Sequence, residues 1–280
     1  MNIINVEHLY KIYGEKIIFD DASFGIQKGD KIGIVGINGT GKSTLLKMIA
    51  GEETPDKGQI IKQNGLNLAY VPQNPVFSED STIRSYALKK GEENWKVESN
   101  LTELNITRFD QKIEHLSGGQ KKRVVLAKIL SDDFDVLLLD EPTNQLDEAM
   151  IRWLEEYLRS YKGTVIMVTH DRYFLDRVTN RILEISHGKM YGYDSDYSGF
   201  LELKAQREEM ESASERKRQS VLRMELEWAK RGCRARTTKQ RARLERLEQL
   251  KNGNTPIKDQ TVELDSVETR MGKKTIELHH

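Results

Sequence analysis

A glycine-rich segment early in the chain limits the possible folds more than any other feature. Residues 36–43 read GINGTGKS and match the pattern G-x-x-x-x-G-K-[ST]. The β-branched run at 31–35 before it predicts a strand, and residues 41–50 after it predict a helix. A strand, a tight turn and a helix N-terminus in this order let backbone N–H groups surround a phosphate. The sequence therefore predicts an α/β fold with a phosphate-binding loop, and the alternative is a chance glycine-rich turn.

The side chains of this loop predict binding of a nucleoside triphosphate together with Mg²⁺. Lys42 can neutralise the β- and γ-phosphates, and Ser43 can ligate Mg²⁺. The other loop residues expected to contact ATP are Gly36, Asn38, Gly39, Gly41 and Thr44. Recognition of a base by stacking on an aromatic ring is weakly selective, so the sequence leaves the choice between ATP and GTP open.

A second segment supplies two carboxylates at the end of a predicted strand. Residues 136–139 and 164–169 are continuous apolar runs, typical of strands buried on both faces of a parallel sheet. Asp140 and Glu141 follow the first run directly. We expect Asp140 to reach the Mg²⁺ shell and Glu141 to act as general base toward an attacking water. The alternative is an exposed acidic strand end.

Residues 116–120 read LSGGQ and resemble the signature of the ABC ATPases. They precede the two carboxylates along the chain, as in that family. The resemblance implies that Ser117, Gly118, Gly119 and Gln120 bind the γ-phosphate of ATP held by a second ABC domain, again through a helix N-terminus. Taken alone, the serine would read as an ordinary helix N-cap. Membership of this family implies ATPase activity, with ATP enclosed between two domains.

Four further positions match motifs of the same family. Gln73 resembles the Q-loop glutamine, which contacts Mg²⁺ and water, and His170 resembles the switch histidine beside the γ-phosphate. Asp147 resembles the D-loop aspartate, which is expected to contribute to ATP binding. Tyr13 resembles the aromatic residue that stacks on adenine, with Tyr10 as a competitor and core packing as the alternative for either ring. The resemblance thus adds Gln73 and His170 to the expected catalytic residues, and Gln73 to the expected metal site.

Three segments resemble one branch of the family, the ABC-F proteins. Residues 140–147 read DEPTNQLD, close to the DEPTNHLD of that branch, with Gln145 in place of the usual histidine. Residues 168–176 resemble its switch region, and parts of 197–240 resemble its interdomain linker. The stretch at 76–113 is too short for the arm insertion of some members. The chain is therefore identified as similar to the armless, Uup-like ABC-F proteins, and it would contain the first ABC domain and the linker.

The predicted ABC domain occupies residues 2–194 and the predicted linker residues 195–254. The first is expected to combine a parallel-sheet core, an antiparallel β subdomain and a small helical subdomain at about 74–130. The second is rich in charged residues and leucine and contains no proline, which is long-helix composition. We expect a helical hairpin with helices at about 200–230 and 237–252.

The last part of the chain, residues 255–280, is expected to be an extended tail. Residues 275–279 resemble residues 5–9 in the predicted first strand, so the tail is interpreted as the start of a second ABC domain. The two final histidines can also be read as the remnant of a purification tag. A second ABC domain, in the same parent chain or in a second copy, is the expected partner.

Basic residues are concentrated where the two linker helices would meet. Residues 229–246 hold eight basic residues and one acidic residue, in a chain whose formal net charge is zero. A cationic hairpin tip suits a nucleic-acid backbone, and the ABC-F resemblance implies rRNA or tRNA on the ribosome. The alternative is a solvated helix surface. The expected RNA-binding residues are Lys230, Arg231, Arg234, Arg236, Lys239, Arg241 and Arg243.

Composition limits the cellular setting. Cys233 is the single cysteine, so no disulfide can form within the chain. The N-terminal segment has no apolar signal region, and no apolar run approaches the roughly 20 residues of a membrane helix. We therefore expect a cytoplasmic protein without membrane insertion. The resemblance implies a task in translation or in ribosome protection against an antibiotic. Two alternatives stay open: the ATP-binding subunit of a membrane transporter and a DNA-directed ATPase.

Overall fold

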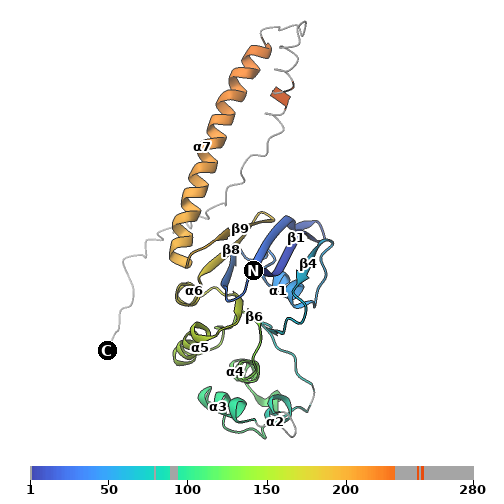
Figure 1. Ribbon diagram of the computed structural model, residues 1–280, viewed down its shortest axis with the longest axis vertical. Helices are drawn as coiled ribbons and strands as arrows, with labels where there is room; N and C mark the ends of the chain where they lie inside the picture. The colour runs from blue at the N-terminus through green and yellow to red at the C-terminus, as the bar shows by residue number, and fades with distance from the viewer. Residues whose placement is uncertain (1, 79, 89–93, 231–244, 246, 249–280) are drawn as a thin grey trace, which may run out of the picture. The chain divides into compact units, whose positions relative to one another are not determined.

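The structure is a computed structural model that describes residues 2–78, 80–88, 94–230, 245 and 247–248, with the backbone alone for 228–230. The chain forms two compact units, Met1–Glu208 and Glu209–His280. The first unit contains strands β1 to β9 and helices α1 to α6 (Figure 1).

The central sheet places the ends of the predicted strands along one edge. Its strand order is β5-β6-β7-β3-β8-β9, and every pair is parallel except β8-β9. The strands are β3 (Lys31–Gly36), β5 (Leu68–Val71), β6 (Val136–Asp140), β7 (Thr164–Val168), β8 (Arg181–Ser186) and β9 (Lys189–Tyr193). Every residue of β6 and β7 is buried, which explains their continuous apolar sequences. The strands predicted at 31–35, 136–139 and 164–169 are confirmed, and β6, β7 and β3 end side by side.

A smaller antiparallel sheet has the order β2-β1-β4. Its strands are β1 (Asn2–Tyr13), β2 (Lys16–Gln27) and β4 (Lys57–Lys62). Helix α1 (Lys42–Ala50) shares one hydrophobic core with both sheets, in which Leu45 and Leu46 meet Phe19 of β2 and Ile34 of β3. This packing brings the start of β2 close to the loop before α1, where Lys16 Nζ donates to Gly39 O at 2.8 Å.

Short helices form the end of the first unit that lies opposite the antiparallel sheet (Figure 1). They are α2 (Ile83–Ala87), α3 (Trp95–Glu103), the 3-10 turn η1 (Ile113–His115) and α4 (Gly118–Ile129). A second hydrophobic core joins them to β6, through residues such as Leu101, Leu126 and Leu139, and to α5 (Glu148–Ser160) and α6 (Arg172–Val178). The predicted parallel core, antiparallel subdomain and helical subdomain are therefore all confirmed.

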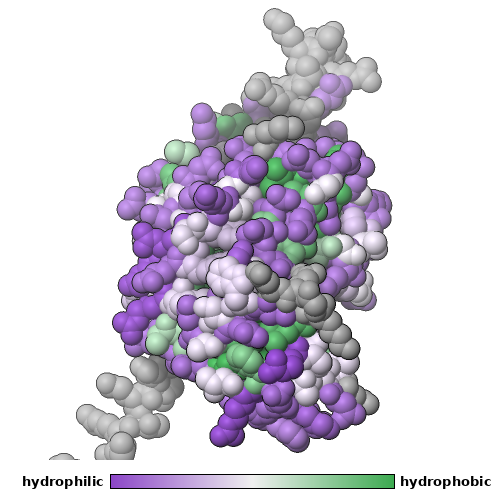
Figure 2. Space-filling view, turned by 60° about the horizontal axis from the view of Figure 1, so that its bottom comes forward, coloured by the Kyte–Doolittle hydropathy of each residue, from purple (hydrophilic) through white to green (hydrophobic). Residues whose placement is uncertain are grey.

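Figure 2 shows a largely hydrophilic face on which hydrophobic residues gather in limited patches. Among the large hydrophobic side chains, Val76 and Tyr173 are the most exposed, at 91% and 82%. None of the helices in the described part of the chain is long and apolar enough to cross a membrane.

Helix α7 (Tyr197–Lys230) begins three residues after the predicted end of the ABC domain at 194. Its first turns belong to the first unit because Phe200 is buried, with its ring 5.1 Å from that of Tyr193. The compact unit therefore extends to Glu208, past the predicted boundary. The helix predicted at 200–230 is confirmed, whereas most of the one predicted at 237–252 lies outside the described residues, so the hairpin stays a prediction.

A buried carboxylate fixes the base of α7 to the sheet. Glu184 of β8 has a side chain that is only 4% exposed and accepts a hydrogen bond from the Tyr193 hydroxyl at 3.1 Å. Its oxygens also lie 2.6 Å from Lys204 Nζ and 3.2 Å from Arg207 Nη1. Both basic residues belong to α7, and Glu184 pairs in the sheet with Val35, just before the glycine-rich loop.

We expect Glu184→Gln to lower the free energy of unfolding by about 2–3 kcal/mol, because the substitution leaves two cations around a neutral amide in a buried site. Urea unfolding measures the change. Glu208→Gln is the matched control, since the Glu208 carboxylate lies 3.7 Å from the same Lys204 but is 53% exposed. Equal losses for the two variants would contradict the anchoring role of Glu184.

Candidate nucleotide-binding and catalytic site

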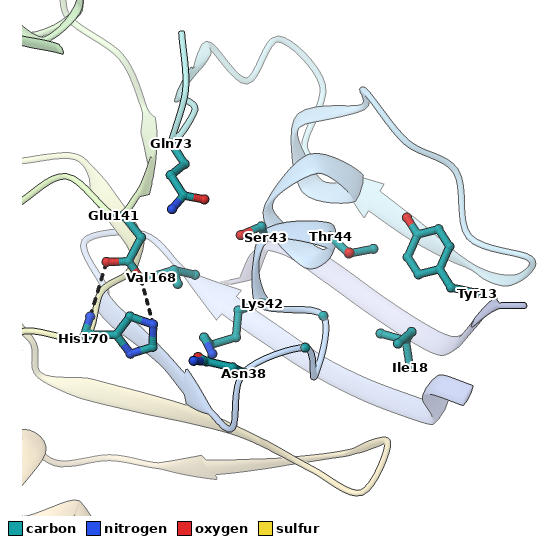
Figure 3. A pocket seen from close by; sticks show the side chains of 12 residues that line it. Tyr13, Ile18, Asn38, Lys42, Ser43, Thr44, Gln73, Glu141, Val168 and His170 are labelled. Atoms are coloured by element: carbon teal, nitrogen blue, oxygen red, sulfur yellow. Dashed lines mark hydrogen bonds and ion pairs between the residues drawn. The ribbon is translucent and has the colours of Figure 1, made fainter. Parts of the chain in front are cut away.

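One pocket lies where β3, β6 and β7 end, and its volume of about 460 Å³ suits a small-molecule ligand. Figure 3 shows side chains from both sheets, α1 and the intervening loops directed toward it. The pocket is lined by Tyr13, Ile18, Asn38, Gly39, Gly41, Lys42, Ser43, Thr44, Gln73, Glu141, Val168 and His170. Ten of these are predicted site residues, and Ile18 and Val168 are additions.

The N-terminus of α1 opens into this pocket without a side-chain cap. Its N-cap, Gly41, has a left-handed backbone with φ of 96° and makes no side-chain hydrogen bond to the first turn. The first backbone bond of the helix runs from Leu45 N to Gly41 O at 2.8 Å. A Cβ at Gly41 would overlap Ile18, so only glycine fits there. The uncapped N–H groups and the helix dipole suit an anion such as a phosphate.

Lys42 brings a positive charge to the same place. Its Nζ donates to the carbonyl oxygens of Gly36 at 2.8 Å and Ile37 at 3.2 Å, which holds the ammonium over the loop. Burial lowers the pKa of Lys42, while the nearby carboxylates of Glu141 and Asp140 oppose that shift. The arrangement places a partly desolvated ammonium beside the uncapped helix N-terminus.

Ser43 and Asp140 place two oxygen atoms that could ligate a metal ion beside the pocket. Ser43 Oγ donates to Asp140 Oδ1 at 3.0 Å, and Asp140 is only 2% exposed. Burial raises the pKa of Asp140, opposed by the Ser43 hydrogen bond and by the charge of Lys122. Among the described residues no three His, Cys, Asp or Glu side chains cluster as a metal cage. A hydroxyl and one carboxylate fit Mg²⁺, which takes few protein ligands and completes its shell with phosphate and water.

Glu141 directs its carboxylate toward His170 (Figure 3). Its side chain is 6% exposed, and its oxygens lie 3.4 Å from His170 Nε2 and from the His170 backbone nitrogen. Burial raises the pKa of the Glu141 carboxyl, whereas His170 lowers it. A carboxylate that is more basic than usual and faces a polar pocket suits a general base. Gln73 lines the same pocket from the loop after β5.

Tyr13 lies at the far end of the pocket from Glu141 (Figure 3). Its hydroxyl donates to Glu53 Oε1, a bond that raises the pKa of Tyr13, and its side chain remains partly exposed. Tyr10, the competing tyrosine, has its ring 5.4 Å from Lys57 Nζ on β4. Because only Tyr13 of these two lines the pocket, it is the better candidate for stacking on a base.

The signature residues lie outside this pocket. Ser117 is the N-cap of α4, with a reciprocal capping box in which Gln120 N donates to Ser117 Oγ at 3.3 Å. The helix-cap interpretation is thus confirmed, while binding of a second domain's nucleotide by Ser117, Gly118, Gly119 and Gln120 stays a prediction. Asp147 is likewise a cap, because its Oδ1 accepts from Met150 N at 3.0 Å.

The predicted RNA-binding residues fall at the edge of the described part of the chain or beyond it. Arg231, Arg234, Arg236, Lys239, Arg241 and Arg243 lie outside the described residues, and only the backbone of Lys230 is described.

Lys122 lies buried beside the site and is not among the residues predicted from the sequence. Lys122 of α4 is 2% exposed, and its Nζ donates to the backbone oxygens of Asp140 and Glu141. A signal was present, because Lys122 lies three and four positions before Val125 and Leu126, on the apolar face of the helix.

Comparison with known proteins supports the same family along most of the chain. Two family models, both described as "ABC transporter", match residues 19–144 and 183–264. The chain is 41% identical to the Uncharacterized ABC transporter ATP-binding protein YfmR of Bacillus subtilis, over 99% of this chain and 51% of that protein. It is 36% identical to the Energy-dependent translational throttle protein EttA of Haemophilus influenzae, over 94% of this chain and 55% of that protein. The chain thus spans about half the length of these relatives.

Solved structures agree with the fold. "Structure of ATP binding subunit of ABC transporter" matches with a TM-score of 0.62 at 24% identity, over 69% of this chain and 90% of that chain. A putative metal-chelate type ABC transporter in an inward-facing conformation matches with a TM-score of 0.56 at 25% identity, over 69% of this chain and 84% of that chain. The sequence models, the sheet order and the pocket lead to one conclusion: this chain carries an ATP-binding domain of the ABC ATPase family.

Proposed function

We propose that the chain is an ABC-F protein that binds and hydrolyses ATP and acts on the ribosome. ATP hydrolysis is supported mainly by the position of Glu141. Its nearly buried carboxylate lines the same pocket as Lys42 and the uncapped start of α1. The ribosomal part is supported by the likeness to EttA, a translational throttle protein by name, and by the basic residues at 229–246.

Each residue of the pocket has a separate proposed role in ATP hydrolysis. Lys42 and the first N–H groups of α1 would bind the triphosphate oxygens. Ser43 and Asp140 would hold Mg²⁺, with Gln73 nearby, and the bound ion supplies charge neutralisation at the phosphates. Glu141 would accept a proton from a water in the pocket, and His170 would keep the Glu141 carboxylate oriented through the contacts at 3.4 Å. Tyr13 would stack on the base.

Completion of the site would need a second ABC domain. Ser117 begins α4 outside the pocket, so its predicted contact with a γ-phosphate requires nucleotide held by another domain. Gly118 is exposed beside it, which leaves this helix N-terminus accessible. ATP would then close two domains together, hydrolysis would release them, and the linker would follow that motion.

Turnover per chain is expected to rise with protein concentration, because two copies of this chain would have to meet to complete one site. A phosphate-release assay across a dilution series measures it. Ser117→Arg is expected to remove the concentration-dependent part, because an arginine would fill the phosphate position at the start of α4. Glu114→Arg, at an exposed position of η1 nearby, is the control. Robust turnover that is independent of concentration would contradict the two-domain site.

Ribosome binding tests the functional proposal. The full chain carrying Glu141→Gln, mixed with bacterial ribosomes, is expected to sediment with them when ATP is present and to be released by added salt. Replacing both Arg234 and Arg236 with glutamate should weaken that binding, whereas Lys28→Glu, at an exposed turn, should not. Absence of co-sedimentation under all conditions would reject the ribosomal role.

A transporter subunit is the second candidate, favoured by the description of both family models and by the name of YfmR. It predicts co-purification with a membrane protein that stimulates ATPase activity. A preference for branched DNA over ribosomes in the same binding assay would instead support the DNA-directed alternative.

A further inference from the structure

We propose that Lys122 is a positioning residue that fixes the backbone carrying Glu141 and links it to the signature helix α4. The inference rests on the proposed ATPase function of the pocket and goes beyond it, because Lys122 itself does not line the pocket. Its ammonium donates to the backbone oxygens of Asp140 and Glu141 at the end of β6, and not to a side chain of the pocket.

The ammonium of Lys122 is buried with two specific partners. The residue is 2% exposed, and Nζ donates to Asp140 O at 3.2 Å and to the adjacent Glu141 O. Burial lowers the pKa of Lys122, while the nearby charges of Asp140 and Glu141 raise it. A buried cation is costly unless its hydrogen bonds are satisfied, so the contact with these two oxygens determines where the side chain can lie.

The two carbonyl oxygens belong to consecutive residues, so a contact with both restricts the backbone conformation of Glu141. In an extended strand, neighbouring carbonyls point in opposite directions, so one ammonium cannot reach both. Glu141 instead has a left-handed backbone with φ of 50°, which is uncommon and strained for a residue other than glycine. Its backbone nitrogen still donates to Val168 O of β7 at 2.8 Å. The lysine thus stabilises the turn that aims the Glu141 side chain at His170.

Helix α4 also contacts the segment after Glu141 at other points. A Cβ on Gly119 would lie 2.5 Å from the backbone oxygen of Gln145, which shows how closely α4 and this loop pack. Arg123 of α4 lies 3.7 Å from Asp147 at the start of α5. Ser117 caps the same helix. If a second domain's nucleotide bound at Ser117 and moved α4, Lys122 would move with the helix and shift the backbone of Glu141. One buried side chain would therefore couple the two halves of a two-domain site.

The test must separate positioning from simple packing. Lys122→Met keeps the chain length of the side chain and removes the donor, whereas Lys122→Gln keeps a donor without the charge. Lys121→Met removes the neighbouring lysine of the same helix and serves as the control. Single-turnover hydrolysis of radiolabelled ATP and the dissociation constant of a fluorescent ATP analogue are measured for each full-length variant, together with its thermal unfolding midpoint.

We expect Lys122→Met to lower the hydrolysis rate about 10- to 100-fold, as expected for a small misplacement of a catalytic group. Its nucleotide affinity should stay within about threefold of the unchanged chain, and Lys122→Gln should restore most of the rate. Lys121→Met should leave both quantities unchanged.

The decisive comparison is made in the Glu141→Gln background. If Lys122 acts through Glu141, adding Lys122→Met to Glu141→Gln should lower the residual rate less than about threefold, because the group being positioned is already lost. Independent, additive losses would overturn the proposal, as would a normal rate in Lys122→Met. If Lys122→Met does not fold, a Lys122→Gln variant that folds but shows the full rate loss would also overturn it. Failure of the unchanged chain to hydrolyse ATP would instead reject the proposed function.

Discussion

Glu141→Gln is expected to lower ATP turnover by about 10²- to 10⁴-fold, the usual contribution of a general base, while nucleotide binding persists. The amide has the same shape and fills the same space beside His170, but it cannot accept a proton from water. Binding should persist because Lys42 and the uncapped start of α1, which are proposed to bind the phosphates, are unchanged. A phosphate-release assay and a fluorescent ATP analogue measure the two quantities separately.

Glu148→Gln provides the control for this experiment. Glu148 lies in the first turn of α5, its side chain is 85% exposed, and its partner is Arg152 at 3.6 Å. Removing that charge should change neither turnover nor affinity. Turnover of Glu141→Gln equal to that of the unchanged chain would reject Glu141 as the base and direct attention to Gln73 or His170, the other predicted catalytic residues in the pocket.

Lys42→Met should weaken ATP binding by about 10²- to 10³-fold, since it removes charge-assisted hydrogen bonds to an anion in a partly desolvated site. AMP should lose much less affinity than ATP, because it lacks the phosphates that Lys42 is expected to contact. Isothermal titration with each nucleotide measures the difference. Lys28→Met, at an exposed turn before β3, is the control for loss of one positive charge. Equal losses for ATP and AMP would contradict the assigned position of the β- and γ-phosphates.

Motifs confined to one short segment could be located from the sequence. The glycine-rich loop at 36–43 joins a strand to a helix in immediate succession, so its spacing alone predicts that the N-terminus of α1 lies at the loop. The positions of Asp140 and Glu141 were also predictable from the sequence, because the buried apolar run of β6 shows where the strand ends. Parallel strands then bring Ser43 and Asp140 to one edge of the sheet although they are far apart in the chain.

Contacts that depend on tertiary packing were not predictable in this way. The spacing of Lys122 to Val125 and Leu126 places it on the apolar face of α4, but its two backbone partners at the end of β6 follow only from tertiary packing. Glu53 holds the Tyr13 hydroxyl from a loop after α1, with no spacing rule that relates the two. The domain boundary predicted at 194 differs from the end of the compact unit because Glu184 and Tyr193 hold the first turns of α7.

A crystal structure of the chain carrying Glu141→Gln, grown with Mg²⁺ and a non-hydrolysable ATP analogue, would show where the nucleotide binds. We expect phosphate oxygens within hydrogen-bond distance of Lys42 Nζ and the first N–H groups of α1, with Mg²⁺ beside Ser43 and with Ser117 of a second copy at the γ-phosphate. Nucleotide bound at another surface, or an empty loop at 36–43, would contradict it.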